Sequence, residues 1–484
     1  MDNFGTYVTK SITENIRKPL KNFSSILANN SELKNAIDLC IEIEKLSPKA
    51  EALVVGGSVR DIILNKNPKD IDIATNVDMD VLEKHFRTDN IGQSKDFGIV
   101  LIHFNSGLYE VAQFREDIFD DSSNSRHPSG VKLGATFKKD SDRRDITINA
   151  LGLSTKGEIV DYQNGLDDIK NGIIKAVGDP KSRFIEDALR MMRVGRFMAR
   201  YGFKIDDATR SAIIEVKDLI KKVSPERIRE ELFKAATSGG SMANYIEHLK
   251  DVGLLDIILP EISVMDKFDH SPDHHPEGNV LQHTLEALRK SESGDPIDNM
   301  AILFHDIGKP HTHAMDGDKI TYYGHDIEGI DIFNKVANRL KLSNEQRDAI
   351  NFAIKYHMVG HDFSKLKKSN AVSIRQDKNW ETLKHVLRSD SAARKHLFNQ
   401  NEFDANIDII DDIHKKFGER EAFEKKMASL ISGGIIMTLV PGIAGKDIGL
   451  IKSNVRDWII TRDFAVSKEE VTNEVIKAAK NIGY

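Results

Sequence analysis

Hydrophobic and polar positions in the first third of the chain follow patterns that predict β-strands joined by short turns. Residues 53–55 are apolar and mostly β-branched, which predicts a buried strand. The pair Gly56-Gly57 after them allows a tight turn, and a helix is predicted from Ser58. Residues 69–75 alternate between polar and apolar side chains, so a second, half-buried strand is expected there.

The remaining patterns predict one hairpin and then helices for most of the chain. Alternation in residues 98–104 and 108–115, on either side of a turn, predicts the hairpin. Apolar residues recur at helical spacing in residues 33–46 and 183–204, and residues 396–484 are also helical and charged. The predicted fold class is therefore α+β, with an N-terminal mixed α/β head followed by all-α domains.

Length and composition indicate a multidomain soluble protein. The 484 residues exceed what one hydrophobic core usually organises, so three or four domains are expected. With 40% hydrophobic and 30% charged residues, no apolar run of membrane-spanning length and no signal-peptide core, a cytoplasmic protein is predicted. The single cysteine, Cys40, excludes an intramolecular disulfide and a thiolate metal cluster.

The formal net charge of −6 argues against a protein that coats nucleic acid, but one segment of the chain is strongly basic. Its basic residues are Lys181, Arg183, Arg190, Arg193, Arg196, Arg200 and Lys204, against the acids Glu186 and Asp187. Arginines three or four positions apart form one stripe along the predicted helix. A solvated basic face is the alternative to a nucleic-acid contact.

Asp70 and Asp72 lie two positions apart in the second predicted strand and therefore on one face of it. Neighbouring carboxylates repel each other, and a divalent cation such as Mg²⁺ would neutralise them. The N–H groups of the Gly56-Gly57 turn suit a phosphate, and Arg60 could bind a triphosphate. The alternative is an ordinary strand with exposed acids, which the presence of both features a short helix apart disfavours.

This stretch resembles the signature of class II tRNA nucleotidyltransferases and bacterial poly(A) polymerases, in the polymerase-β nucleotidyltransferase superfamily. The resemblance implies that Asp70 and Asp72 hold two Mg²⁺ ions, which activate an RNA 3′-hydroxyl for attack on a nucleotide α-phosphate. Glu110 matches the family's third catalytic acid, with a solvent-facing strand acid as the alternative. The polar residues 117–130 are predicted to form a mobile loop, which in this family helps the site to switch nucleotides.

Further motifs resemble the nucleotide-binding elements of this family. Residues 143–145 match its RRD motif, in which guanidiniums bind phosphate and the acid holds ribose hydroxyls; Ile146 replaces the usual aromatic residue. The resemblance places selection of CTP and then ATP on Asp187 and Arg190, and residues 224–240 resemble a bracing neck motif. The residues predicted to bind nucleotide are Gly56, Gly57, Arg60, Arg144, Asp145, Asn149, Asp187, Arg190 and Arg193, and those predicted to bind RNA are Arg196 and Arg200.

Histidines and acids recur on successive predicted helices after residue 270. The pair His305-Asp306 lies within an apolar helix, where burying two polar side chains is costly without a ligand. Imidazole and carboxylate suit Mn²⁺, Ni²⁺, Co²⁺ or Zn²⁺, whereas any single histidine here would more often be structural. The pattern resembles an HD metal-dependent phosphohydrolase domain. Its predicted ligands are His283, His305, Asp306 and Asp390 for one metal ion, with His325 and His357 available for a second.

The resemblance divides the chain into a nucleotidyltransferase head (1–175), a neck (176–265), an HD domain (266–395) and an RNA-binding tail (396–484). It implies template-independent addition of CCA to the 3′ end of tRNA from CTP and ATP, with removal of 2′,3′-cyclic phosphates by the HD domain. A poly(A) polymerase, or an enzyme that adds only A or only CC, is the nearest alternative. An RNA-binding phosphohydrolase with an inactive head, or a silent RNA-binding scaffold, is opposed by the intact motifs. The oligomeric state, monomer or homodimer, stays open.

Overall fold

The chain folds into two compact units, each of which is described by itself. The computed structural model describes residues 16–68, 70–89, 98–118, 130–269, 278–317, 319–394 and 397–484. Unit 1 comprises Met1–Glu231 and Asn244–Ile258, and unit 2 comprises Leu232–Ala243 and Leu259–Tyr484. This division is coarser than the four domains predicted from the sequence, which stay a prediction.

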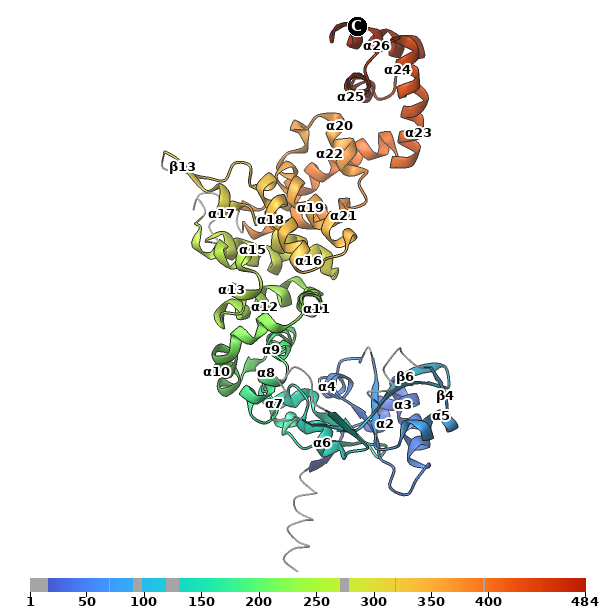
Figure 1. Ribbon diagram of the computed structural model, residues 1–484, viewed down its shortest axis with the longest axis vertical. Helices are drawn as coiled ribbons and strands as arrows, with labels where there is room; N and C mark the ends of the chain where they lie inside the picture. Colours follow the sequence, from blue (N-terminus) through green and yellow to red (C-terminus); the bar gives the residue numbers. More distant parts are fainter. Residues whose placement is uncertain are drawn as a thin grey trace, which may run out of the picture. The chain divides into compact units, whose positions relative to one another are not determined.

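Unit 1 is built on a sheet of eight strands in the order β1-β10-β9-β2-β3-β6-β5-β4 (Figure 1). In that order the strands are Arg17–Pro19, Glu158–Asp161, Leu151–Leu153, Ala52–Val55, Asp72–Thr75, Gly107–Gln113, Ile99–Phe104 and Arg87–Asp89. Neighbouring strands are antiparallel except β3 and β6, which run parallel. Buried side chains such as Leu53, Ala74 and Phe137 form a core on this sheet. The strands that carry the candidate acids therefore lie in its middle.

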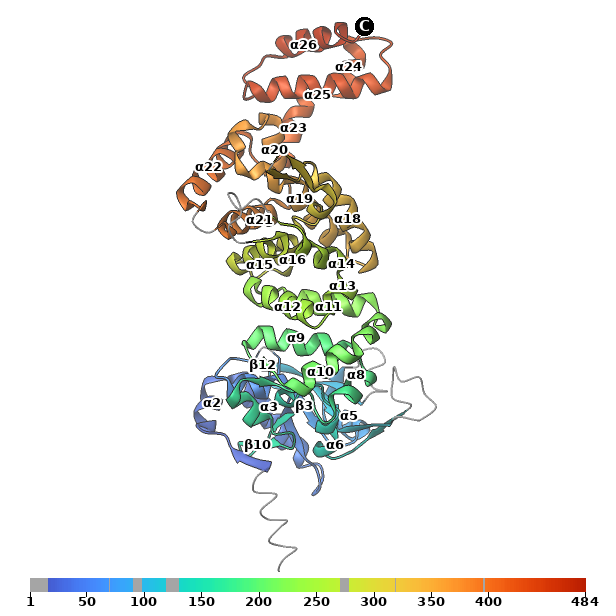
Figure 2. The same cartoon turned by 90° about the vertical axis from the view of Figure 1, so that its left-hand side faces the viewer.

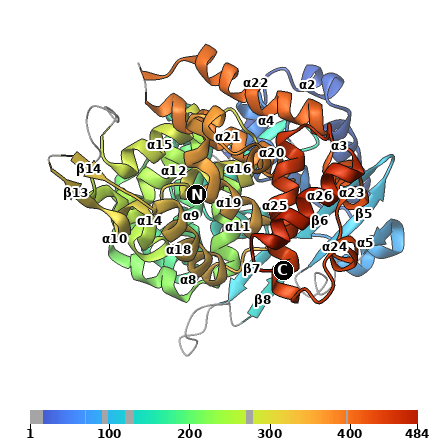
Figure 3. The same ribbon diagram turned by 90° about the horizontal axis from the view of Figure 1, so that it is seen from above.

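Short helices and one ribbon accompany the sheet of unit 1. The helices are α2 (Phe23–Asn29), α3 (Ser31–Glu44), α4 (Gly57–Ile63), α5 (Met79–His85), α6 (Phe137–Asp142), η2 (Thr147–Asn149) and α7 (Gly165–Asn171). Strands β7 (Arg115–Ile118) and β8 (Gly130–Leu133) pair as a separate ribbon (Figure 3). Between them, residues 119–129 of the predicted mobile loop lie outside the described residues.

The first strand, the glycine turn, the helix after it and the hairpin of β5 and β6 are confirmed. The prediction of a strand throughout residues 69–75 was wrong at its beginning, because β3 starts only at Asp72 and Asp70 precedes it. Lys69 lies outside the described residues. The alternation of burial nevertheless holds: Ile71 and Ile73 are buried and the two aspartates are exposed.

The neck of unit 1 begins with two helices where the spacing across residues 183–204 predicted one. α8 (Pro180–Glu186) ends at an extended residue, Asp187, and α9 (Leu189–Tyr201) follows. The other elements are β11 (Ile173–Ile174), β12 (Lys204–Ile205), α10 (Asp207–Val216), η3 (Lys217–Lys222), α11 (Pro225–Ala235), α12 (Gly239–Asp251) and α13 (Leu255–Ile258). Helices α11 and α12 are each divided between the two units.

Unit 2 is almost entirely helical, and its last helices, α24, α25 and α26, pack together (Figure 2). Its elements are α14 (Pro260–Ser263), η4 (Val264–Lys267), α15 (Val280–Lys290), α16 (Pro296–Phe304), α17 (Lys309–Thr312), β13 (Ala314–Asp316), β14 (Lys319–Thr321), α18 (His325–Arg339), α19 (Asn344–Tyr356), η5 (His357–His361), η6 (Phe363–Lys365), α20 (Lys368–Arg375), α21 (Trp380–Ala393), α22 (Gln400–Phe417), α23 (Arg420–Leu430), α24 (Gly433–Leu439), α25 (Gly445–Thr461) and α26 (Lys468–Lys480). The predicted α+β fold class is confirmed. Among the described residues, no helix has both the length and the apolar character needed to cross a bilayer.

Candidate active site and candidate metal centre

Three acidic side chains meet where β3 and β6 run side by side. Asp72 begins β3, Asp70 lies two residues before it, and the parallel register sets Glu110 of β6 level with Asp72. Although Asp72 is exposed, the surrounding protein partly shields its carboxyl from water and raises its pKa; Arg144 opposes this rise and the charge of Asp70 adds to it. Partial shielding from water and the charge of Asp72 also raise the pKa of Glu110. Mutually unfavourable carboxylates of this kind are the oxygen ligands that Mg²⁺ takes in proteins.

The turn between β2 and α4 brings the backbone close to two guanidinium groups. Gly56 has a φ of +75°, and a Cβ added there would lie 3.0 Å from Nη1 of Arg144. A Cβ at Gly57 would lie 3.2 Å from Nη2 of Arg60. Arg144 is also close enough to Asp72 to oppose the rise in its pKa. Arg144 therefore connects the glycine turn with the acidic group, as a triphosphate-binding role would require.

Both arginines of the 143–145 motif contact a buried acid, Asp140, that was not predicted from the sequence. Oδ1 of Asp140 accepts a hydrogen bond from Nη2 of Arg143 at 2.8 Å, and its Oδ2 accepts one from Nη2 of Arg144 at 3.0 Å. Although burial raises it, the charges of Arg144 and Arg143 hold the pKa of Asp140 below its usual value. The helical spacing of Asp140 to these arginines was the signal that could have identified it.

Asp145 joins the head to helix α9 of the neck. Its Oδ2 accepts a hydrogen bond from Nε of Arg193 at 2.7 Å, and its Oδ1 accepts from the side chain of Asn149 at 3.3 Å. Although burial raises it, the charge of Arg193 holds the pKa of Asp145 below its usual value. The structure thus brings together three residues predicted to bind nucleotide, and Asp145 remains ionised as an acceptor of hydrogen bonds.

The guanidinium group of Arg60 is buried, with only 3% of the residue exposed. Its Nε donates to Oδ1 of Asp61 at 3.0 Å, and its Nη1 donates to Oδ1 of Asn149. It lies 5.1 and 4.8 Å from the ring centroids of Phe197 and Tyr201, and the Tyr201 hydroxyl donates to Asp61 at 2.9 Å. The triphosphate contact of Arg60 stays a prediction, and this placement favours a role in joining α4 to α9.

Asp187 forms the break between α8 and α9, and Arg190 lies in the first turn of α9. Oδ2 of Asp187 accepts from Nη2 of Arg227 at 2.7 Å. Arg190 donates to Oε2 of Glu186 at 2.7 Å and to the backbone carbonyl of Arg143 at 2.9 Å. A nucleotide base would have to share or replace these partners. Arg227 was not predicted as a site residue, although it lies in the segment interpreted as a brace.

The two arginines predicted to bind RNA have opposite surroundings. The side chain of Arg196 is 9% exposed, and its Nε lies 2.6 Å from Oε2 of Glu231, whose side chain is 2% exposed. The side chain of Arg200 is 46% exposed, and its guanidinium lies 3.9 Å from Asp61. RNA binding stays a prediction for both residues, but the burial of Arg196 favours a bracing role.

We expect Arg196→Ala to lower the free energy of unfolding by about 3 kcal/mol, because it removes the cation that lies 2.6 Å from the buried carboxylate of Glu231. Arg200→Ala is the matched control from the same helix and should unfold like the parent protein. It should instead weaken RNA binding and reduce the dependence of that binding on salt. Thermal unfolding and RNA titrations measure both effects. Unchanged unfolding of Arg196→Ala together with weaker RNA binding would reverse the two assignments.

The head and neck of the chain are similar in sequence to known proteins. Residues 52–175 match the family described as the poly A polymerase head domain, and residues 202–265 match a probable RNA and SrmB-binding site of polymerase A. The CCA-adding enzyme of Enterococcus faecalis is 42% identical over 222 residues, which are 45% of this chain and 53% of the relative. The CCA-adding enzyme of Bacillus licheniformis is 38% identical over 205 residues, 42% of this chain and 50% of the relative. The chain thus spans about half the length of the curated relatives it matches.

These matches cover the glycine turn, the three acids and the arginine motif described above. The head and neck of the chain are thus similar in sequence to class II CCA-adding enzymes and bacterial poly(A) polymerases. Its fold is similar to that of the Bacillus stearothermophilus CCA-adding enzyme in complex with CTP, with a TM-score of 0.68 and 20% identity over 93% of this chain and 98% of that chain. The Thermotoga maritima CCA-adding enzyme complexed with tRNA gives a TM-score of 0.55 and 17% identity over 96% of this chain and 99% of that chain.

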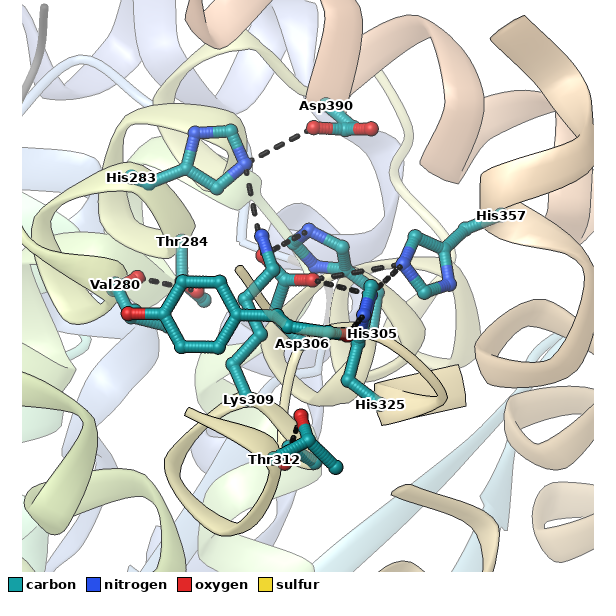
Figure 4. A network of polar contacts seen from close by, with 12 residues as sticks. Val280, His283, Thr284, His305, Asp306, Lys309, Thr312, His325, His357 and Asp390 are labelled. Carbon is teal, nitrogen blue, oxygen red and sulfur yellow. Dashed lines mark hydrogen bonds and ion pairs between the residues drawn. The ribbon is translucent and has the colours of Figure 1, made fainter. Parts of the chain in front are cut away.

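A second group of candidate ligands lies in unit 2, beyond residue 265, where the second of the two family-model matches ends. Asp306 is at its centre, buried with 1% exposed (Figure 4). Its Oδ2 faces His283 and His305 at 3.8 and 3.2 Å from their Nε2 atoms. Its Oδ1 lies 3.5 Å from Nε2 of both His325 and His357. The two oxygens of one carboxylate therefore face two separate pairs of imidazoles.

Backbone carbonyls fix the orientation of three of these rings. Nδ1 of His305, His325 and His357 each lies 2.7 Å from the carbonyl oxygen three residues earlier, so each Nδ1 carries the proton and donates it. Each Nε2 then offers a lone pair toward Asp306. Burial lowers the pKa of His325 to about 4, which keeps that ring neutral near pH 7. Proteins orient histidine ligands of metal ions through such hydrogen bonds.

Unsatisfied atoms at this site fit a bound cation. Nε2 of His325 and Nε2 of His357 lie 3.0 Å apart, although both carry lone pairs when the rings are neutral. Oδ1 of Asp306 is buried and lacks a hydrogen-bond partner, and Nζ of Lys309 lies 2.7 Å from Oδ2. Although burial raises it, the contacts with His305 and with the cation of Lys309 hold the pKa of Asp306 well below its usual value. The ionised carboxylate and neutral imidazoles suit Mn²⁺, Ni²⁺ or Co²⁺.

The structure brings together all six residues predicted as HD ligands. Two groups have ligand atoms within 4.8 Å of one another: His283 with His305 and Asp306, and Asp306 with His325 and His357. Asp390 lies next to the first group, because its Oδ1 is 2.9 Å from Nε2 of His283. Sequence spacing could not show that Asp306 belongs to both groups.

Proposed function

We propose that unit 1 adds nucleotides to the 3′ end of RNA without a template, and that its reaction is CCA addition to tRNA from CTP and ATP. The convergence of Asp70, Asp72 and Glu110 beside a glycine turn carries this proposal. The match of residues 52–175 to the poly A polymerase head domain, and the similarity to relatives named CCA-adding enzymes, support it. A structure of one relative contains CTP and another contains tRNA, which supports the same choice of substrates.

In this proposal Asp70 and Asp72 hold Mg²⁺, with Glu110 as a third acid at the same end of the sheet. The metal would supply charge that stabilises the attacking 3′-oxygen and the departing pyrophosphate. Arg144 and the Gly56-Gly57 turn would hold the triphosphate. The protein thereby orients the α-phosphate in line with the RNA hydroxyl, which is the main catalytic contribution in phosphoryl transfer.

The remaining predicted residues would either select the nucleotide or support the site. Asp187 and Arg190 would read the base, and Asp145, with Arg193 and Asn149 as its partners, would hold the ribose. Arg60 is better placed to hold α9, which carries Arg190, against the head. RNA would lie along exposed cations such as Arg200 and along the C-terminal helices.

The nearest alternative is a poly(A) polymerase, or an enzyme that adds only A or only CC. Incubating the protein with tRNA that lacks its tail, and with each labelled nucleotide singly and in combination, separates these reactions by the length and composition of the product. The second alternative is an RNA-binding phosphohydrolase with an inactive head, for which no nucleotide would be added under any combination.

Replacement of Asp187 with alanine should reduce nucleotide discrimination more than RNA binding. Its carboxylate is proposed to accept a hydrogen bond from the base, so discrimination should fall by about 1 to 3 kcal/mol. Misincorporation of UTP and GTP measures this loss, and a titration with tRNA measures affinity. Asp218→Ala is a suitable control, because Asp218 is an exposed neck acid paired with Lys221. Complete exclusion of UTP and GTP by Asp187→Ala would locate base selection elsewhere.

We propose a second function for unit 2, hydrolysis of 2′,3′-cyclic phosphates during repair of RNA 3′ ends. This proposal rests on the arrangement of four imidazoles around Asp306, with two of them facing each of its carboxylate oxygens. In the reaction a water oxygen would bond to phosphorus, one ester P–O bond would break, and the released ribose oxygen would take a proton. Metal-loaded protein and adenosine 2′,3′-cyclic phosphate test this activity directly.

A further inference from the structure

Three aromatic rings form a continuous row beside the metal centre, which we call the aromatic row. The ring centroids of Phe268 and His313 lie 5.5 Å apart, and those of His313 and Tyr322 lie 5.6 Å apart. Phe268 follows η4, His313 follows α17, and Tyr322 precedes α18. His313 is exposed and the other two are half-buried, so the row lies at the surface and outside the hydrophobic core of the unit.

Tyr322 connects the aromatic row to the metal centre. Its backbone carbonyl accepts the hydrogen bond from Nδ1 of His325 at 2.7 Å. Nζ of Lys309, which contacts Asp306, lies 5.8 Å from the centroid of the Tyr322 ring. Burial and the nearby charge of Asp306 raise the pKa of Tyr322 to about 12. Only the side chain of Lys309 therefore separates the Tyr322 end of the row from the proposed metal ligand Asp306.

Several apolar side chains close to the aromatic row in the sequence are exposed to solvent. Tyr323, which follows Tyr322, is 82% exposed, and Ile327, two residues after His325, is 69% exposed. Met315, on the strand that follows His313, is 59% exposed. Exposed apolar side chains beside a polar site offer surface on which a ligand can pack.

We propose that the aromatic row binds the base of a nucleotide whose phosphate lies at the metal centre. This inference rests on the proposed phosphohydrolase function and adds the group that would distinguish a nucleoside phosphate from other phosphoesters. A flat base packs on aromatic rings whatever its hydrogen-bonding edge, so the row would accept any terminal base of an RNA. The adjacent Lys309 and metal ions supply the positive charge that the phosphate requires.

The alternative is that Tyr322 only supports the fold, since its hydroxyl donates to the backbone carbonyl of Asp269 at 2.6 Å. Two substrates distinguish these roles: adenosine 2′,3′-cyclic phosphate carries a base, and glycerol 1,2-cyclic phosphate has the same reacting ring without one. A supporting role would affect both substrates equally. A role in binding the base would affect only the first.

We expect Tyr322→Ala to raise KM for the adenosine substrate about tenfold, in line with measured stacking contributions. KM for the glycerol substrate should stay unchanged, and Tyr322→Phe should behave like the parent protein because it keeps the ring. His313→Ala should act in the same direction as Tyr322→Ala. The metal content of Tyr322→Ala should also be unchanged, because its backbone carbonyl still orients His325.

Equilibrium binding provides a readout that does not depend on hydrolysis. Calorimetric titration of the metal-loaded protein with adenosine 3′-phosphate and with glycerol phosphate should show tighter binding of the nucleotide, and Tyr322→Ala should remove the difference. If hydrolysis fails but this difference is present, the phosphohydrolase function is wrong and the base site stands. Equal binding of the two ligands, or equal losses for both substrates in Tyr322→Ala, would overturn the base site while leaving hydrolysis intact.

Discussion

Asp72→Asn is expected to lower nucleotide addition at least about 100-fold while leaving the fold unchanged. Asp72 begins β3, with Asp70 two residues earlier and Glu110 level with it on β6. Replacing its carboxylate with an amide removes one negative charge from the group that would hold both Mg²⁺ ions. The amide has nearly the same shape, so packing of the sheet should not change. Single-turnover addition of labelled CTP to tRNA without its tail measures the loss.

Two controls separate this effect from general damage. Asp89→Asn changes an exposed acid on β4, another strand of the same sheet, and should add nucleotides like the parent protein. Metal binding by unit 2 of Asp72→Asn should also be unchanged, because its ligands belong to a separate compact unit. Addition at a near-normal rate by Asp72→Asn would exclude Asp70 and Asp72 as the catalytic pair.

Local patterns were sufficient to predict the elements that carry this site. Burial alternates through Asp70, Ile71, Asp72 and Ile73 as the sequence does, even though the strand itself begins only at Asp72. The break at Asp187 was missed because apolar residues on α8 and α9 keep a helical spacing across it. Periodicity reports which face of an element is buried, and it is less sensitive to a short interruption in the backbone.

The partners of the site residues could not be predicted, because they come from distant parts of the chain. The sequence predicted that Arg60 binds a triphosphate. In the structure its guanidinium group packs against the rings of Phe197 and Tyr201. Arg196 and Arg200 share one helical stripe, yet only Arg196 meets the buried carboxylate of Glu231. Sequence spacing places side chains on a face of a helix, and the tertiary fold decides whether that face is buried.

The same limit applies to the metal centre, where spacing identified the ligands but not their grouping. Asp306→Ala should lose both bound metal ions and with them the hydrolysis of 2′,3′-cyclic phosphates, because each of its oxygens faces one pair of imidazoles. His325→Ala removes a ligand from only one group, so it should retain about one metal ion of two. Nucleotide addition should be retained in both variants.

Elemental analysis after loading with Mn²⁺, Ni²⁺ or Co²⁺ measures the stoichiometry, and adenosine 2′,3′-cyclic phosphate measures hydrolysis. His385→Ala is the matched control, because His385 belongs to the same unit but has a side chain that is 41% exposed and lies near Asp298 instead. Equal metal loss from Asp306→Ala and His325→Ala would indicate a single ion held by all the ligands together. If the parent protein binds none of these metals and hydrolyses no phosphoester, the buried histidines are a structural core and the nucleotidyltransferase is the remaining proposed activity.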